Sequence, residues 1–222
     1  MHNRVRIKVC GITNPEDAMA AVELGVDALG FVRASSPRQI PVAEIRGIGR
    51  SLPPFVAKVG VFVNAHLDDI LKEAESGELD TIQLHGEESP ETVQACISRG
   101  FSVIKAFRVR GTDVLGDIER YRDCQLTALL LDTYVPGRAG GTGQVCDWRI
   151  AWQVGRKHRM ILAGGLHPGN VRAALCAAAP WAVDVSSGVE SSPGHKCPDR
   201  MARFVRQVTA HTKERSLNNA QA

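Results

Sequence analysis

Strand and helix signals alternate from one end of this chain to the other. Eight short apolar runs rich in Val, Ile or Leu are each followed by a stretch whose apolar residues have helical spacing. The predicted strands are 5–10, 28–32, 56–63, 81–84, 102–106, 128–131, 160–163 and 182–185. The predicted helices begin at Pro15 and then cover 42–50, 67–75, 89–99, 114–122, 147–155, 170–178 and 198–210. Such alternation is typical of parallel strands joined by right-handed crossovers.

Eight strand–helix repeats in 222 residues predict one compact (β/α)₈ barrel, the TIM-barrel fold of the α/β class. A doubly wound sheet is the alternative, and it usually has a G-x-G-x-x-G sequence after its first strand. The loop from Cys10 to Pro15 lacks that pattern. No shift in composition marks a domain boundary. We therefore expect a single domain over residues 1–212 and a polar, disordered tail over 213–222.

Composition and charge argue against several classes of function. The net charge is +3, and Lys and Arg are scattered without a basic run, which gives no support for nucleic-acid binding. No apolar stretch is long enough to span a membrane, and no signal-peptide core follows the N-terminus. The six cysteines show no metal-binding or disulfide spacing. They predict reduced thiols in a cytoplasmic protein.

The end of the first predicted strand carries a thiol. Alternation with a period of two places Lys8 and Cys10 on one face and Val9 on the other. The outward face of a barrel strand packs against helices and is apolar, so Lys8 and Cys10 are expected to point inward, with Cys10 at the C-terminal mouth. An ammonium group beneath a thiol would favour the thiolate, the form that acts as a base or nucleophile. A buried structural cysteine is the alternative.

A carboxyl group closes the sixth predicted strand. Asp132 follows an apolar run, and partial desolvation would raise its pKa and suit it to act as a general acid. A helix cap or turn is the alternative. Cys10 and Asp132 would face each other across the mouth, which suits an acid–base pair. On the eighth strand, Asp184 lies deeper and is expected to orient the substrate or a loop.

Further polar side chains follow other strands. Gln83 and His85 are expected to line the mouth and bind substrate. A metal site at His85 is the alternative, but the sequence has no second cluster of ligand residues with the spacing of a metal site. Arg38 follows the second strand, where a guanidinium group is suited to a substrate carboxylate. Lys105 is the candidate for Schiff-base chemistry, which makes a barrel aldolase the alternative enzyme.

Three glycine-rich stretches, 140–143, 163–166 and 186–190, are predicted loops at strand ends. Small residues let backbone N–H groups approach an anion closely. The pattern predicts that a phosphorylated small molecule is held over the mouth by Gly141, Gly143, Gly164, Gly165, Ser187 and Gly188. A non-catalytic phosphosugar-binding protein would keep these loops but would have no use for Cys10 or Asp132.

These motifs, in this order, resemble the phosphoribosylanthranilate isomerase family of tryptophan biosynthesis from about residue 6 to 205. The stretches that carry the resemblance are 8–13, 36–38, 60–64, 83–86, 130–132, 140–143, 163–166 and 184–190. The resemblance implies that Cys10 is the general base, Asp132 the general acid and Arg38 the ligand of the anthranilate carboxylate. It also implies a phosphate site at the loops after the seventh and eighth strands, and a reaction without cofactor or metal. Both a monomer and a homodimer stay open.

Overall fold

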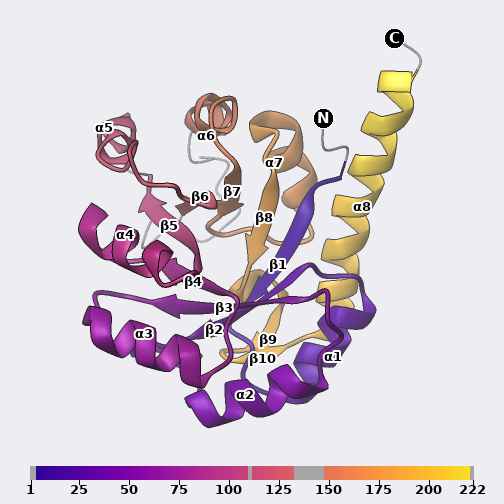
Figure 1. Cartoon of the computed structure of the whole chain (residues 1–222). Helices are drawn as coiled ribbons and strands as arrows, with labels where there is room; N and C mark the ends of the chain where they lie inside the picture. The colour runs from indigo at the N-terminus through magenta and orange to yellow at the C-terminus, as the bar shows by residue number, and fades with distance from the viewer. Residues whose placement is uncertain (1–3, 110–111, 133–147, 221–222) are drawn as a thin grey trace.

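The computed structural model describes residues 4–109, 112–132 and 148–220, and it confirms the (β/α)₈ barrel (Figure 1). Eight parallel strands close into one ring in the order in which they follow along the chain. They are β1 (Arg6–Cys10), β2 (Ala28–Val32), β3 (Ala57–Phe62), β4 (Thr81–Leu84), β5 (Ser102–Arg108), β6 (Ala128–Asp132), β7 (Met160–Ala163) and β8 (Ala182–Val185). No boundary of these strands differs from its prediction by more than two residues.

Helices surround the barrel on its outer side. They are α1 (Pro15–Glu23), α2 (Val42–Ser51), α3 (Leu67–Ser76), α4 (Pro90–Ser98), α5 (Val114–Glu119), α6 (Trp148–Gly155), α7 (Val171–Ala178) and α8 (Pro198–Ala220). The local sequence explains where α1 begins. The Asn14 side chain accepts a hydrogen bond from the Asp17 N–H at 2.8 Å, and Pro15 occupies the first turn.

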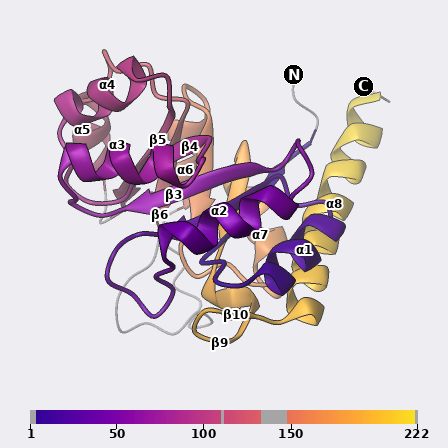
Figure 2. The ribbon, with the colours of Figure 1, turned by 60° about the horizontal axis from the view of Figure 1, so that its bottom comes forward.

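The last helix is longer than the sequence pattern predicts. α8 continues to Ala220, so residues 213–220 extend this helix instead of forming the expected tail. Contact with the neighbouring helix continues past the predicted end, because Arg172 Nη2 on α7 pairs with Glu214 Oε2 at 2.7 Å. Figure 2 shows α8 beside α1 and α7, both of which it contacts.

The apolar core has two parts, one between barrel and helices and one inside the barrel. The inner part consists of Val59, Ile104, Ala106, Ala128, Leu130, Ile161, Ala163 and Ala182. Full burial of a Leu or Ile side chain contributes about 1.5–3 kcal/mol to stability, so this filling stabilises the barrel. Cys10 and Asp132 are the last residues of β1 and β6, and the barrel therefore presents polar groups at its C-terminal end.

A short hairpin after β8 is absent from the sequence-based prediction. A 3₁₀ turn, η1 (Ser187–Val189), leads into β9 (Glu190–Ser192), which pairs antiparallel with β10 (His195–Lys196). The Lys196 Nζ donates to the Cys10 carbonyl oxygen at 2.6 Å and so holds the hairpin against the C-terminal end of β1 (Figure 1). Strands of three and two residues are too short for a periodic signal.

Candidate active site

The predicted thiol lies inside the barrel with its lysine neighbour. Cys10 is 9% exposed and Lys8 is 3% exposed. A Cβ atom built on Gly30 would lie 2.8 Å from Cys10 Sγ and 2.9 Å from Lys8 Nζ, so both side chains use the space above this glycine. Lys8 Nζ also lies 2.9 Å from Asp184 Oδ1, which makes a buried ion pair across β1 and β8.

Lys8 lowers the pKa of the Cys10 thiol, as expected, but it does not set the net direction of the shift. Burial raises the pKa of Cys10, and the nearby Lys8 ammonium, which lowers it, does not compensate. The Asp184 carboxylate also raises the pKa of Cys10 and neutralises much of the lysine's field. Burial alone would lower the pKa of Lys8, but Asp184 raises it, so this residue is an ammonium ion. At neutral pH, Cys10 is therefore a protonated thiol.

The predicted acid is hydrogen-bonded to a predicted mouth residue. Asp132 Oδ2 lies 3.2 Å from His85 Nε2, and both side chains are about one-fifth exposed at the C-terminal end of the barrel. On the other side of the ring, Gln83 Nε2 lies 3.0 Å from His85 Nδ1. Gln83 is fully buried. These three residues form a chain of hydrogen bonds from β4 to β6.

Arg38, which is predicted to bind the substrate carboxylate, pairs with a carboxylate of the chain itself. Arg38 donates from Nε to Glu190 Oε1 at 2.8 Å and from Nη2 to Glu190 Oε2 at 2.6 Å. Burial would raise the pKa of Glu190, but its hydrogen bonds from Arg38 and Lys196 lower it, so it is ionised. The sequence analysis assigned no role to Glu190 or Lys196. No local sequence pattern marks the role of Glu190, because its partner Arg38 lies 152 positions away in the sequence.

The loops after β7 and β8 touch each other. A Cβ atom on Gly188 would lie 1.9 Å from the Leu166 carbonyl oxygen, so only glycine allows this approach. Gly164 and Gly165 follow β7 with φ values of 89° and 63°, in the left-handed region that favours glycine. Ser187 begins η1 beside them. The other two predicted phosphate ligands, Gly141 and Gly143, lie outside the described residues.

Lys105, the candidate for Schiff-base chemistry, is enclosed. Its Nζ donates to the carbonyl oxygens of Gly86 at 2.7 Å and Ala106 at 3.0 Å, and it lies 3.2 Å from Glu88 Oε2. Lys105 is only 2% exposed, and burial lowers the pKa of its ammonium group. A Schiff-base lysine needs a free amine that faces the substrate. This amine instead fixes the loop after β4, which argues against an aldolase.

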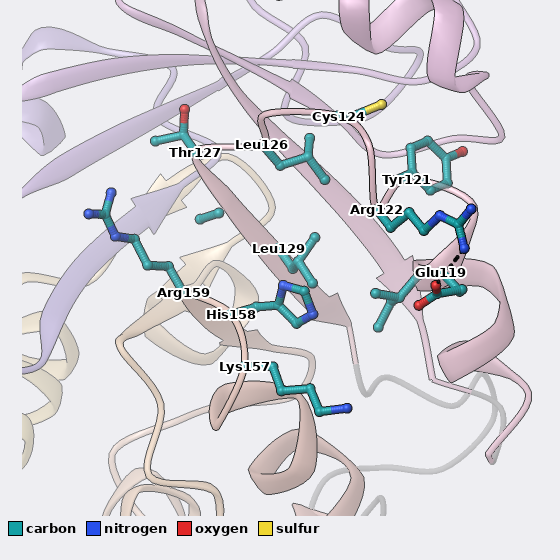
Figure 3. Close-up of a pocket in the computed structure, with 12 residues that line it drawn as sticks. Glu119, Tyr121, Arg122, Cys124, Leu126, Thr127, Leu129, Lys157, His158 and Arg159 are labelled. Carbon is teal, nitrogen blue, oxygen red and sulfur yellow. Dashed lines mark hydrogen bonds and ion pairs between the residues drawn. The ribbon is translucent and has the colours of Figure 1, made fainter.

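A cavity of about 260 Å³ lies near the N-terminal ends of β6 and β7, opposite the C-terminal mouth of the barrel (Figure 3). It is lined by Thr127 and Leu129 of the β6 region and by the turn before β7 that contains His158. The side chains of Arg122 and Glu119 pair with each other at 3.3 Å at its edge. None of the predicted site residues lines this cavity in the described part of the chain. The C-terminal mouth is therefore the candidate active site.

Other kinds of site find little support in the described residues. Within 4–109, 112–132 and 148–220, no group of three or more His, Cys, Asp or Glu residues is arranged to hold a metal ion. No helix in the same ranges is long and apolar enough to cross a membrane. The cysteines in these ranges are free thiols: Cys10, Cys96, Cys124, Cys176 and Cys197.

Comparison with known proteins agrees with this geometry. Residues 7–207 match the family described as N-(5'phosphoribosyl)anthranilate (PRA) isomerase. The N-(5'-phosphoribosyl)anthranilate isomerase of Citrifermentans bemidjiense is 49% identical over 204 residues, which covers 91% of this chain and 96% of the relative. The crystal structure of phosphoribosyl anthranilate isomerase from Thermotoga maritima has a TM-score of 0.85 and 43% identity, over 93% of this chain and 99% of that one.

A further solved relative carries a ligand. It is a phosphoribosyl anthranilate isomerase in complex with reduced 1-(o-carboxyphenylamino)-1-deoxyribulose 5-phosphate, with a TM-score of 0.82 and 41% identity. That match covers 93% of this chain and 99% of the relative. This structural match and the family match over residues 7–207 therefore cover nearly the same part of the chain. The chain belongs to the phosphoribosylanthranilate isomerase family.

Proposed function

We propose that this chain isomerises N-(5'-phosphoribosyl)anthranilate to 1-(2-carboxyphenylamino)-1-deoxyribulose 5-phosphate, the reaction of its family in tryptophan biosynthesis, with Asp132 as acid and Cys10 as base. One observation carries the assignment of roles. The carboxyl group of Asp132 and the thiol of Cys10 belong to the last residues of β6 and β1, so both lie at the same mouth of the parallel barrel. Two titratable groups in different surroundings suit opposite proton transfers.

The chemistry divides into two proton transfers. Asp132 donates a proton to the ribose ring oxygen while the bond from that oxygen to C1 breaks, and the anilino nitrogen supplies the electron pair that forms an iminium ion. Cys10, as the thiolate, then removes the proton from C2, and the released electron pair forms the C1–C2 double bond of an enolamine. Movement of a proton from the C2 hydroxyl group to C1 gives the ketone. Substrate and product have the same atoms, so the reaction needs no external oxidant.

The remaining site residues hold the two ends of the substrate. Arg38 binds the anthranilate carboxylate through the guanidinium N–H groups that do not donate to Glu190. The backbone N–H groups around Gly165 and Gly188 bind the phosphate, with Gly141 and Gly143 as further candidates. With both ends held, proton transfer at C2 and at the ring oxygen becomes effectively intramolecular. Lys8 and Asp184 form the buried ion pair beneath Cys10 and keep the thiol at the mouth.

The direct test is turnover of the substrate. Phosphoribosylanthranilate added to the purified protein should lose its anthranilate fluorescence at a rate proportional to enzyme concentration, while a sample without enzyme changes slowly. A folded protein that leaves the fluorescence unchanged would contradict the proposed function. Trapping of an adduct on Lys105 by borohydride would instead favour the aldolase.

The partners follow from the same proposal. The substrate is a small phosphorylated molecule, and neither nucleic acid nor a membrane is part of the reaction. We place the enzyme in the cytoplasm, as a monomer or a homodimer. The relative from Thermotoga maritima is a dimeric enzyme from which monomers have been generated.

Replacing Arg38 with Met is expected to weaken binding of phosphoribosylanthranilate far more than binding of inorganic phosphate. A charge-assisted hydrogen bond is worth about 1.5–3 kcal/mol, which corresponds to roughly 10- to 150-fold in affinity. Equilibrium titration with each ligand measures the difference. The matched control is Arg50→Met, which breaks an exposed pair with Glu78 and should change neither affinity. Equal losses for both ligands in Arg38→Met would place this residue at the phosphate.

Replacing Gly188 with Ala is expected to weaken binding of inorganic phosphate. The added methyl group would meet the Leu166 carbonyl oxygen, so the loops after β7 and β8 must separate. Loss of two backbone hydrogen bonds, each worth about 0.5–1.5 kcal/mol, lowers the affinity by roughly tenfold. Gly47→Ala on α2 is the control, because a Cβ atom added there would meet nothing within 4 Å beyond its chain neighbours and the backbone of its own helix. Unchanged phosphate inhibition in Gly188→Ala would remove this loop from the phosphate site.

A further inference from the structure

Arg38 is held by one edge of its guanidinium group, and another edge is left for a ligand. Its Nε and Nη2 donate to the two carboxylate oxygens of Glu190, at 2.8 and 2.6 Å. A guanidinium group has five N–H donors, so the pair with Glu190 leaves the Nη1–Nη2 edge with two parallel donors. Such an edge matches a second carboxylate. No residue that the structure describes accepts a hydrogen bond from Arg38 Nη1.

The uncovered part of Arg38 lies at the C-terminal mouth of the barrel. The Arg38 side chain is 24% exposed and that of Glu190 only 4%, so the edge that faces Glu190 is the covered one. The stem of Arg38 crosses Gly11, the residue that follows β1. A Cβ atom added to Gly11 would lie 2.6 Å from Arg38 Cδ and 3.2 Å from Ser186 Oγ. The guanidinium group is therefore placed beside the ends of β1 and β8.

Glu190 is itself fixed from several sides. Lys196 Nζ donates to Glu190 Oε1 at 2.8 Å and to the Cys10 carbonyl oxygen at 2.6 Å. The Glu190 carbonyl oxygen accepts a hydrogen bond from Arg200 of α8. The Lys196 N–H donates to Asp17 Oδ2 at 2.8 Å, which ties the hairpin of β9 and β10 to α1 (Figure 1). The Glu190 carboxylate thus has a fixed place relative to the strand end that carries the thiol.

We propose that Glu190 is a positioning residue that holds Arg38 in the orientation in which its Nη1–Nη2 edge binds the substrate carboxylate. The proposal deepens the proposed function and rests on it. Without Glu190 the guanidinium group would still attract an anion, but it would be free to turn about its side-chain bonds. Binding would then cost the rotamer entropy that the pair with Glu190 has already removed. Arg38 thus supplies the attraction, and Glu190 supplies its direction.

The opposite role for Glu190 is that of a competitor for Arg38. A competitor occupies the donors that the ligand needs, so its removal strengthens binding. A positioning residue occupies another edge, so its removal weakens binding. The geometry favours positioning, because Glu190 uses Nε and leaves Nη1 to a ligand. Lys196 also keeps Glu190 in place when a ligand arrives.

The test compares two ligands that differ only in the carboxylate. The first is reduced 1-(o-carboxyphenylamino)-1-deoxyribulose 5-phosphate, the compound that a solved relative holds. The second is the same compound without the carboxyl group on its ring. Calorimetric titration gives the ratio of the two affinities, which a change at the phosphate loops leaves unaltered. For the wild-type protein we expect the carboxylate to improve affinity by roughly 10- to 150-fold.

The main variant is Glu190→Gln, which keeps the size of the side chain. One of the two oxygens becomes an NH2 group that only donates, so Arg38 loses one of its paired bonds whichever way the amide turns. We expect the ratio to fall by about tenfold, the effect of losing one charge-assisted hydrogen bond to the ligand. Glu190→Gln added to Arg38→Met should not change the ratio further. The control, Glu214→Gln, breaks an Arg–Glu pair between α8 and α7 and should leave the ratio unchanged.

A second variant, Arg38→Lys, leaves the buried Glu190 in place and keeps the positive charge. A single ammonium group has no pair of parallel donors, so we again expect the ratio to fall by about tenfold. An unchanged ratio in Glu190→Gln or in Arg38→Lys would overturn the proposal. A higher ratio in Glu190→Gln would show that Glu190 competes with the ligand. An equal fall in the presence and absence of Arg38 would show that Glu190 acts through another group.

These titrations need no turnover, so they separate the proposal from the proposed function. A wild-type protein whose ratio depends on Glu190 but which does not isomerise phosphoribosylanthranilate contradicts the function alone. A protein that isomerises the substrate while Glu190→Gln keeps the wild-type ratio contradicts the role of Glu190 alone. Equal affinity of the wild-type protein for the two ligands contradicts Arg38 as the carboxylate ligand and overturns the proposal with it.

Discussion

Asp132→Asn is expected to lower kcat by about 10²- to 10⁴-fold, the usual loss when a positioned acid is removed. Asn has nearly the same shape as Asp and its side-chain oxygen can still accept from His85 Nε2, so the hydrogen-bond chain from β4 survives. The amide has no proton that it can give to the ribose ring oxygen. Steady-state kinetics with phosphoribosylanthranilate measures the loss directly.

Binding and chemistry must be separated in this experiment. The variant should still bind reduced 1-(o-carboxyphenylamino)-1-deoxyribulose 5-phosphate, the compound that a solved relative holds, with nearly unchanged affinity. Asp123→Asn makes the same substitution at an exposed position after α5 and should keep full activity. If Asp132→Asn retains kcat, another group protonates the ring oxygen. If it loses ligand binding to the same extent as kcat, Asp132 is a ligand and not the acid.

The strands could be predicted because each carries its own local signal. β4, β7 and β8 agree with the prediction at both ends, since short apolar runs between polar turns mark a buried strand well. β5 is longer than predicted because its alternation continues through Phe107 to Arg108 while it pairs with β6. α8 also exceeds its predicted length, and its pairing with α7 through Glu214 is not visible in local periodicity.

The sequence predicted only those residues of the candidate site that lie on the barrel strands or at their ends. Period-two alternation was enough to place Cys10, Asp132 and Gln83 on the inner face. It could not find that Glu190 holds Arg38, because that contact depends on how the hairpin after β8 folds back. It also could not weigh burial against the charge of Lys8, which requires the depth of the thiol and the position of Asp184.

Cys10→Ser is expected to lower kcat by about 10²- to 10⁴-fold, because a hydroxyl group is far too weak an acid to form the anion that removes the C2 proton. The wild-type enzyme should also show a specific pH dependence. The base works in its deprotonated form, and burial raises the pKa of Cys10. The thiolate fraction therefore grows only toward alkaline pH, and the ascending limb of kcat should lie at higher pH than for an ordinary thiol.

Alkylation tests the same thiol without substrate. The rate of reaction of Cys10 with iodoacetamide should rise with pH along the same limb as kcat, since both processes use the thiolate. Cys176→Ser removes an exposed thiol on α7 and should leave kcat and its pH profile unchanged. Asp184→Asn removes the carboxylate that raises the pKa of Cys10, so both limbs should shift together toward lower pH in this variant. A kcat limb that stays in place while the alkylation limb shifts would show that Cys10 is not the base.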